Sequence, residues 1–150
     1  MKKYLKNIGL FLLFMLLYFL PTIIFKADKE YYFSLKKPFF APSPIIFSIC
    51  WTILYVIFSI ILIKILKKEY REGIVILAIN YIIGFFFNYF FFIKHNLFIS
   101  FCDTFLCFCS GLLLFIYFMK KDRYLAFSVT PYLLWTAFAS VLICTIFFIN

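Results

Sequence analysis

The side chains that could do chemistry in this 150-residue chain are few, and most familiar catalytic patterns are missing. The single histidine, His95, stands in a short polar stretch, where an interfacial residue is expected rather than a general base. The sequence contains no H-E-x-x-H, no glycine-rich phosphate loop and no serine elbow. It therefore predicts no metal site and offers few catalytic candidates.

Asp103 is a carboxyl group inside an otherwise apolar segment. Polar groups at membrane depth are costly without partners, and they often mark functional sites. Asp103 lies on the second turn of its segment, which leaves two interpretations open. It lies near enough to the interface to stay hydrated, or it faces the protein interior, where it would orient a polar ligand group or cap a helix.

A second polar feature is a helix face that carries two asparagines. Positions i, i+4, i+7, i+8 and i+11 are occupied by Asn80, Gly84, Phe87, Asn88 and Phe91, which places them on one side of an α-helix. Because asparagine side chains avoid lipid, this face is expected to point inward. Hydrogen bonds between helices and contact with a ligand both remain open as its role.

The two tryptophans, Trp51 and Trp135, are the remaining candidates. Tryptophan usually belongs to the aromatic belt at a membrane interface. Each of these lies several residues inside its apolar segment, however, and an interior indole N–H that needs a partner suggests a cavity wall. Trp51 shares a helix face with Phe47, Leu54, Tyr55 and Phe58, and Trp135 shares one with Pro131, Ala139 and Leu142.

The composition shows which elements must position these residues. The chain is 67% hydrophobic and only 14% charged, whereas soluble domains carry about 25% charged residues. It is therefore expected to be an integral membrane protein. The net charge of +9 does not indicate nucleic-acid binding, because the Lys and Arg residues form short clusters between apolar runs.

Transmembrane helices need about 20 mostly apolar residues, and five segments qualify. We expect an all-α, single-domain bundle of five spans over residues 1–150, at 7–25, 43–63, 73–93, 97–119 and 124–149. The lysines before the first span also fit a signal peptide. That span ends at "FLPTIIFK" without a small-x-small cleavage site, so a retained helix is favoured.

The distribution of Lys and Arg predicts a cytoplasmic N-terminus. The side that holds the N-terminus and the second and fourth loops carries more of them: Lys2, Lys3, Lys6, Lys64, Lys67, Lys68, Arg71, Lys120, Lys121 and Arg123. The other side carries Lys26, Lys29, Lys36, Lys37 and Lys94. Multi-pass insertion in a bacterial plasma membrane is the expected localisation.

The first loop, residues 26–42, is long and rich in aromatic residues and proline. Pro38 and Pro42, with Pro44 after the loop, fix φ and bias each preceding residue toward extended conformations. A stiff loop with apolar side chains is expected to fold over one end of the bundle as a lid.

Three segments resemble the TspO/MBR family over most of the chain. They are "YYFSLKKPFFAPSPIIFSICWTILYVIF", "NYIIGFFFNYFFFIKHNLFISFCD" and "PYLLWTAFASVLICTIFFIN". The resemblance implies a five-helix membrane bundle, often a homodimer, with a cavity for porphyrins and related hydrophobic ligands under a lid. By position, Trp51 and Trp135 match cavity tryptophans and Ala139 matches a small cavity-lining residue. Some bacterial members are reported to degrade tetrapyrroles in light.

The sequence departs from the family pattern at several tryptophans. Phe39, Phe40 and Ile45 stand where tryptophan is frequent, and Gly84 and Phe87 replace a common asparagine and tryptophan. These changes keep an apolar wall but remove indole N–H donors and oxidisable rings. The steroid-associated pattern L-x-x-Y-x-x-R/K is not met near the end of the last span, so cholesterol binding by that weak motif is not expected.

Three functions follow as hypotheses: a receptor or sensory protein that binds tetrapyrrole-like ligands, an enzyme that degrades them through Trp51 and Trp135, and a small transporter. Binding is favoured over transport because the chain has no transporter-like internal repeat. No cofactor is required, and the expected partners are a tetrapyrrole such as porphyrin or haem, the lipid bilayer and a second copy of the chain. The expected ligand-binding residues are Trp51, Tyr55, Asn80, Gly84, Phe87, Asn88, Phe91, Asp103, Trp135 and Ala139, with Tyr32, Pro38, Phe39, Phe40 and Pro42 in the lid.

Overall fold

The computed structural model describes residues 2–150, and every regular element within that range is helical. Five helices are long and apolar enough to cross a membrane, which confirms the expected all-α bundle of five spans. The elements are α1 (Lys2–Ile24), α2 (Lys29–Ser34), α3 (Pro44–Lys67), α4 (Arg71–Phe85), the π-helix η1 (Tyr89–Ile93), α5 (Leu97–Lys121) and α6 (Arg123–Ile149).

The starts of α5 and α6 are set by residues with side-chain acceptors. Asn96 caps α5 by accepting a hydrogen bond from the Ile99 N–H at 2.9 Å. Asp122 caps α6 by accepting from the Tyr124 and Leu125 N–H groups at 3.1 and 3.3 Å. Such caps satisfy N–H groups that have no partner within the helix, so the short polar breaks between apolar runs become tight turns.

Asp122 also joins two connections at the same end of the bundle, because it forms an ion pair with Lys68, the residue that follows α3. The hydrogen bond from Lys68 is the main reason that the pKa of Asp122 lies below its usual range. The same bond raises the pKa of Lys68. This pair lies outside the spans and fixes the α5–α6 turn against the end of α3.

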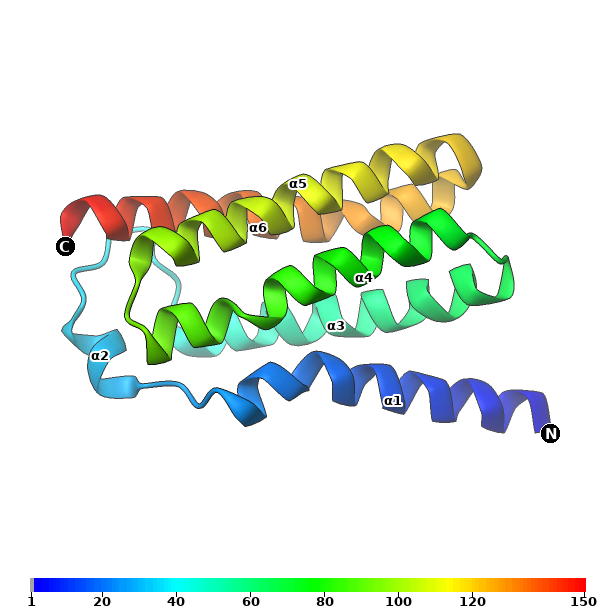
Figure 1. Cartoon of the computed structure of the whole chain (residues 1–150), viewed down its shortest axis with the longest axis horizontal. Coiled ribbons are helices and arrows are strands. Elements are labelled where there is room, and N and C mark those ends of the chain that lie inside the picture. Colours follow the sequence, from blue (N-terminus) through cyan, green and yellow to red (C-terminus); the bar gives the residue numbers. More distant parts are fainter. Residues whose placement is uncertain (1) are drawn as a thin grey trace.

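The helices run alternately up and down, so the loops divide between two ends (Figure 1). The N-terminus and the α3–α4 and α5–α6 connections lie at one end, and α2 and the C-terminus lie at the other. The helix pair α5 and α6 packs along its length, α4 covers α5, and α1 packs on α3 and α4.

Two clusters of buried apolar side chains hold this arrangement together. The larger cluster lies between α3, α4, α5 and α6 and is formed by Leu54, Phe58, Ile61, Ile65, Leu77, Leu114, Phe118, Leu125, Ala126, Val129 and Tyr132. The smaller cluster lies toward the end that holds α2 and the C-terminus, which we call the lid end, and is formed by Phe91, Leu142, Ile143 and Ile146. Helix α5 can approach α6 closely because position 111 is glycine, where a Cβ would lie 2.8 Å from Cε1 of Tyr132. Small residues at such crossings are typical of membrane bundles.

The third span differs from the continuous helix expected over 73–93. Helix α4 ends at Phe85, and the chain resumes as η1, in which the Lys94 N–H donates to the Tyr89 carbonyl at 2.9 Å. A π-helical turn re-aims the residues around it and is frequent at functional sites.

The first loop differs from expectation in one respect, because it contains the short helix α2. Asp28 caps this helix by accepting a hydrogen bond from the Tyr31 N–H at 2.9 Å. The other loop residues, including the proline-rich stretch before α3, lack regular structure.

Candidate functional site

A cavity of about 690 Å³ lies inside the bundle at the lid end. Its walls come from α1, α3, α4, η1, α5 and α6, and residues of the first loop contribute to its mouth. Ligand pockets in proteins have volumes of about 300–1,000 Å³ and mostly apolar linings with a few polar groups. Size and position therefore identify this cavity as the candidate binding site.

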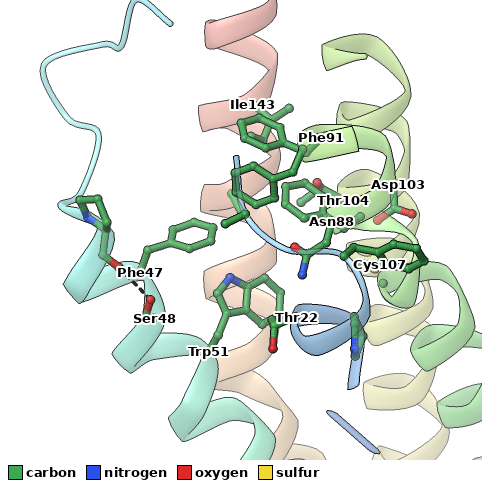
Figure 2. A pocket seen from close by; sticks show the side chains of 18 of the residues that line it. Thr22, Phe47, Ser48, Trp51, Asn88, Phe91, Asp103, Thr104, Cys107 and Ile143 are labelled. Carbon is green, nitrogen blue, oxygen red and sulfur yellow. Dashed lines mark hydrogen bonds between the residues drawn. The ribbon is translucent and has the colours of Figure 1, made fainter. Parts of the chain in front are cut away.

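The cavity has an aromatic wall and a more polar wall. Figure 2 shows Phe47 and Trp51 on one side, with Asp103, Thr104 and Cys107 of α5 on the other. Asn88 lies between these two groups in the same view. A flat apolar ligand would thus meet aromatic rings on α3 and polar atoms on α4 and α5.

The structure gathers most of the residues expected at a binding site. The cavity lining includes Trp51, Tyr55, Asn80, Gly84, Phe87, Asn88, Phe91, Asp103 and Ala139, together with Tyr32 and Pro42 of the first loop. Four expected residues are not part of the lining, namely Trp135, Pro38, Phe39 and Phe40. Phe39 is fully exposed, so its ring is free to contact the membrane surface rather than a ligand.

Asn80 joins three helices and has little capacity left for a ligand. Its Nδ2 donates to the Cys107 carbonyl at 3.0 Å and to Ser110 Oγ at 2.8 Å. Its Oδ1 accepts a hydrogen bond from the Tyr132 hydroxyl at 3.0 Å. Both amide hydrogens are thereby used. Of the two roles open for this side chain, the geometry favours hydrogen bonding between helices.

Asp103 faces the protein interior rather than the hydrated interface. Asp103 is only 7% exposed, and it lines the cavity. Within residues 2–150, its buried Oδ2 has no hydrogen-bond partner. A buried polar atom without a partner is costly, so Asp103 offers an unused acceptor to a ligand donor.

Asn88 reaches the cavity next to the interruption of the third span. It precedes η1 and follows the turn at Phe86. No hydrogen bond joins its side chain to another residue in the described part of the chain. Asn88 therefore differs from Asn80, because its amide is available to a ligand.

Trp135 lies at a contact between helices instead of at the cavity. Its ring centroid is 5.5 Å from that of Phe47 on α3 and 5.4 Å from that of Phe138. The indole therefore packs where α3 meets α6, and it is not part of the cavity lining. Its Nε1 is buried and finds no acceptor among the described residues.

The first loop is fixed to the turn between η1 and α5. The Tyr31 ring stacks on His95 with centroids 3.8 Å apart, and its hydroxyl donates to the His95 carbonyl at 3.4 Å. His95 Nε2 lies 3.3 Å from Oδ2 of Asp28. His95 has a φ of 50°, a left-handed conformation that non-glycine residues adopt only when their surroundings hold it. Partial burial raises the pKa of Tyr31, whose hydroxyl is protonated at neutral pH even at its ordinary pKa.

A second attachment joins the first loop to α6. Oδ1 of Asn150 accepts a hydrogen bond from the Lys36 N–H at 2.9 Å, and Nδ2 of Asn150 donates to the Lys36 carbonyl at 3.0 Å. The loop therefore has two anchors, one on the η1–α5 turn and one on α6. This is the arrangement that a lid over the cavity requires.

We expect Asn150→Ala to loosen the lid. The substitution removes both bonds to Lys36, and a net hydrogen bond contributes about 0.5–1.5 kcal/mol. Loss of both bonds amounts to about 1–3 kcal/mol, so amide hydrogen exchange at Lys36 should accelerate by roughly fivefold or more. Thr145→Val is the control, because the Thr145 hydroxyl bonds only within α6, to the Val141 carbonyl. Equal exchange in both variants would show that the side chain of Asn150 does not hold the lid.

Several lining residues were not predicted from the sequence as ligand contacts. Cys107 stands four residues after Asp103, so helical spacing alone would have placed it on the same wall. Lys29 and Lys37 line the mouth from the first loop, but nothing in the sequence distinguishes them from the other lysines of that loop. Phe47 could have been found because it shares a helix face with Trp51.

The five long apolar helices, which surround an internal cavity, identify the chain as an integral multi-pass membrane protein. The family model described as the TspO/MBR family matches residues 8–149. The chain belongs to the TspO/MBR family.

Individual relatives match over most or all of their lengths. An uncharacterized membrane protein, YtaB of Bacillus subtilis (strain 168), is 33% identical over 97% of this chain and 97% of its own length. The tryptophan-rich protein TspO of Bacillus cereus is 30% identical over 100% of this chain and 99% of its own. The protein of the same name from Chlorobaculum tepidum is 30% identical over 83% of this chain and 82% of its own length.

Proposed function

We propose that this protein is a membrane receptor or sensory protein that binds tetrapyrrole-like hydrophobic ligands in the lidded cavity. The observation that carries the proposal is the cavity itself, with a volume of about 690 Å³ and an aromatic wall opposite a few polar atoms. Aromatic faces suit a flat conjugated ligand, and the Asp103 and Asn88 side chains suit its nitrogen-bound hydrogens. Membership of the TspO/MBR family is consistent with this proposal.

Degradation of the ligand through two tryptophans is less well supported. Such chemistry needs both indoles at one cavity, whereas Trp51 lines the cavity and Trp135 packs between α3 and α6. Transport needs a path open to both sides of the membrane, and the buried cluster around Phe58, Leu114 and Phe118 fills the bundle beyond the cavity. Binding requires neither feature.

The remaining parts of the proposal concern surroundings and partners. We propose that the protein lies in a bacterial plasma membrane with its N-terminus in the cytoplasm. We also propose that it forms a homodimer, does not bind nucleic acid and requires no cofactor. The excess of Lys and Arg at the end that holds the N-terminus supports this orientation.

Titration of the purified protein with protoporphyrin in the dark tests the proposed function. Bound porphyrin should quench most of the tryptophan emission, because Trp51 lines the cavity and Trp135 lies one aromatic ring away. Ala139→Phe places a ring in the cavity and should weaken binding by about tenfold or more, since a buried clash costs about 1–3 kcal/mol. Ala137→Phe is the matched control, because Ala137 does not line this cavity.

The titration has a clear contrary result. Unchanged tryptophan emission at saturating porphyrin would contradict the cavity placement. Equal weakening by the substitutions at positions 137 and 139, with both variants folded, would place the porphyrin elsewhere on the protein.

A further inference from the structure

The cavity is polar at two places, and the two places differ in chemical character. At the mouth, the charged groups in the lining are Asp28, Lys29 and Lys37 of the first loop. Deeper in the cavity wall, the side chain that can carry a charge is Asp103. Asp103 lies six residues into α5, which is about 9 Å along the helix from its first residue.

The carboxylate at the mouth already has partners. Asp28 Oδ1 accepts a hydrogen bond from the Tyr31 N–H at 2.9 Å. Its Oδ2 lies 3.3 Å from Nε2 of His95. Within residues 2–150, Asp28 forms no ion pair with Lys29 or Lys37, and the two lysines outnumber this one carboxylate at the mouth.

Lys37 holds its ammonium group in a defined position at the mouth. Its Nζ lies 4.5 Å from the ring centroid of Tyr32 and 5.7 Å from that of Phe33. It donates to the Leu35 carbonyl at 3.0 Å. An ammonium group has three N–H donors, and none of the carboxylates in residues 2–150 forms an ion pair with Lys37. Donors thus remain for an anionic group.

The deeper site disfavours the same anionic group. No lysine or arginine lines the cavity beside Asp103, whose Oδ2 has no hydrogen-bond partner among the described residues. Moving a carboxylate to membrane depth without a cation is also costly. A ligand with one acidic end would therefore lie with that end at the lid and its apolar body inside.

We infer that Lys37 determines specificity for ligands that carry a carboxylate, and that it holds this carboxylate at the mouth while the apolar body fills the cavity. The inference rests on the proposed function and adds the ligand's acidic group and its orientation. Lys29 supplies additional positive charge at the same mouth. Lys36, its neighbour in sequence, is not part of the cavity lining.

The test uses two probes that differ only in the acidic groups, protoporphyrin and its dimethyl ester. Affinities are measured for wild type, Lys37→Gln, Lys37→Arg and Lys36→Gln in nanodiscs of phosphatidylcholine, which carry no net anionic lipid. For each protein we take the ratio of acid affinity to ester affinity and compare it with the wild-type ratio. Differences in how the two probes partition into lipid then cancel.

We expect Lys37→Gln to lower this ratio by about tenfold, which corresponds to about 1.4 kcal/mol and fits a charge-assisted hydrogen bond. Affinity for the ester should stay within about twofold of wild type, because the ester has no charge for Lys37 to bind. Lys37→Arg should keep most of the ratio, and Lys36→Gln should leave it unchanged.

Three results would overturn the inference. An unchanged ratio in Lys37→Gln, which includes an equal loss of affinity for acid and ester, would show that Lys37 does not recognise the carboxylate. If wild type no longer prefers the acid over the ester when phosphatidylglycerol is added, the site at the mouth binds a lipid headgroup instead. If wild type binds neither probe, the proposed function fails together with the inference, whereas the first two results would leave ligand binding intact.

Discussion

Replacing Asn80 by leucine is expected to cause a large loss of stability without a change in side-chain size. The substitution removes the bonds that join α4 to α5 and α6, and it leaves the buried Tyr132 hydroxyl without its acceptor. An orphaned buried polar group costs about 1–3 kcal/mol. Hydrogen bonds between membrane helices add on average about 0.6 kcal/mol each. The expected total is about 2–4 kcal/mol, or a decrease in Tm of roughly 4–16 °C for a chain of this size.

Asn88→Leu is the matched control for this prediction. Asn88 lies on the same segment and lines the same cavity, but its side chain makes no hydrogen bond within the described residues. Its substitution should leave the Tm within about 2 °C of wild type, as is usual where no interaction is lost, while weakening the binding of a ligand that uses the amide. Thermal unfolding in detergent, followed by circular dichroism, measures both variants. Equal melting temperatures for Asn80→Leu and wild type would refute a structural role for Asn80.

The number and extent of the spans could be predicted because membrane helices leave a strong signal in sequence. Apolar runs of the required length are separated by Lys, Asp and Asn residues, and Asp122 and Asn96 became the caps of α6 and α5. The face shared by Asn80, Gly84 and Phe91 was also predictable from spacing, and all three residues line the cavity.

The interruption of the third span could not be predicted in the same way. Apart from Gly84 and Asn88, the residues around Phe86 are apolar or aromatic, and neither proline nor a charge marks the end of α4. Hydropathy reports the depth of a segment in the membrane, but it does not report the local hydrogen-bond pattern. That pattern decides that the side-chain amide of Asn88 is free for a ligand, whereas the amide of Asn80 is used between helices. The sequence alone does not distinguish the two.

The position of Trp135 shows a second limit of reasoning from the sequence. Helical spacing places Trp135 on the same side of α6 as Ala139, which lines the cavity. Whether an inward-facing residue meets a cavity or a neighbouring helix depends on the tertiary contact, here with Phe47 of α3. The family resemblance implied a cavity tryptophan at this position, and the structure does not bring its indole into the lining.

The two tryptophans should therefore respond differently to substitution. Trp51→Ala removes a large aromatic surface from the cavity wall, and the residues whose truncation costs about 2 kcal/mol or more at binding sites are enriched in tryptophan. Affinity for protoporphyrin should fall by about 30-fold or more. Trp135→Phe should change this affinity by less than about twofold, because the ring does not line the cavity.

The two substitutions should also separate in their effects on stability. Trp135→Phe keeps a ring between Phe47 and Phe138 and removes the buried Nε1 that has no acceptor among the described residues. Removal of an unsatisfied donor offsets the smaller packing area, so the Tm should stay near the wild-type value. A large loss of porphyrin affinity in folded Trp135→Phe would show that this residue contacts the ligand.

Illumination of the porphyrin complexes of these variants distinguishes a protein that only binds the ligand from an enzyme that degrades it. Trp51→Phe keeps an aromatic wall but removes the oxidisable indole next to the ligand. If the protein only binds, illumination of the porphyrin complex should bleach wild type, Trp51→Phe and Trp135→Phe at the same rate once occupancy is matched. A tryptophan radical mechanism at the cavity would instead make the rate collapse in Trp51→Phe while Trp135→Phe stays active. We expect equal rates, because Trp51 is the one indole among the described residues that line the cavity, so a mechanism that needs two cavity tryptophans lacks its second ring.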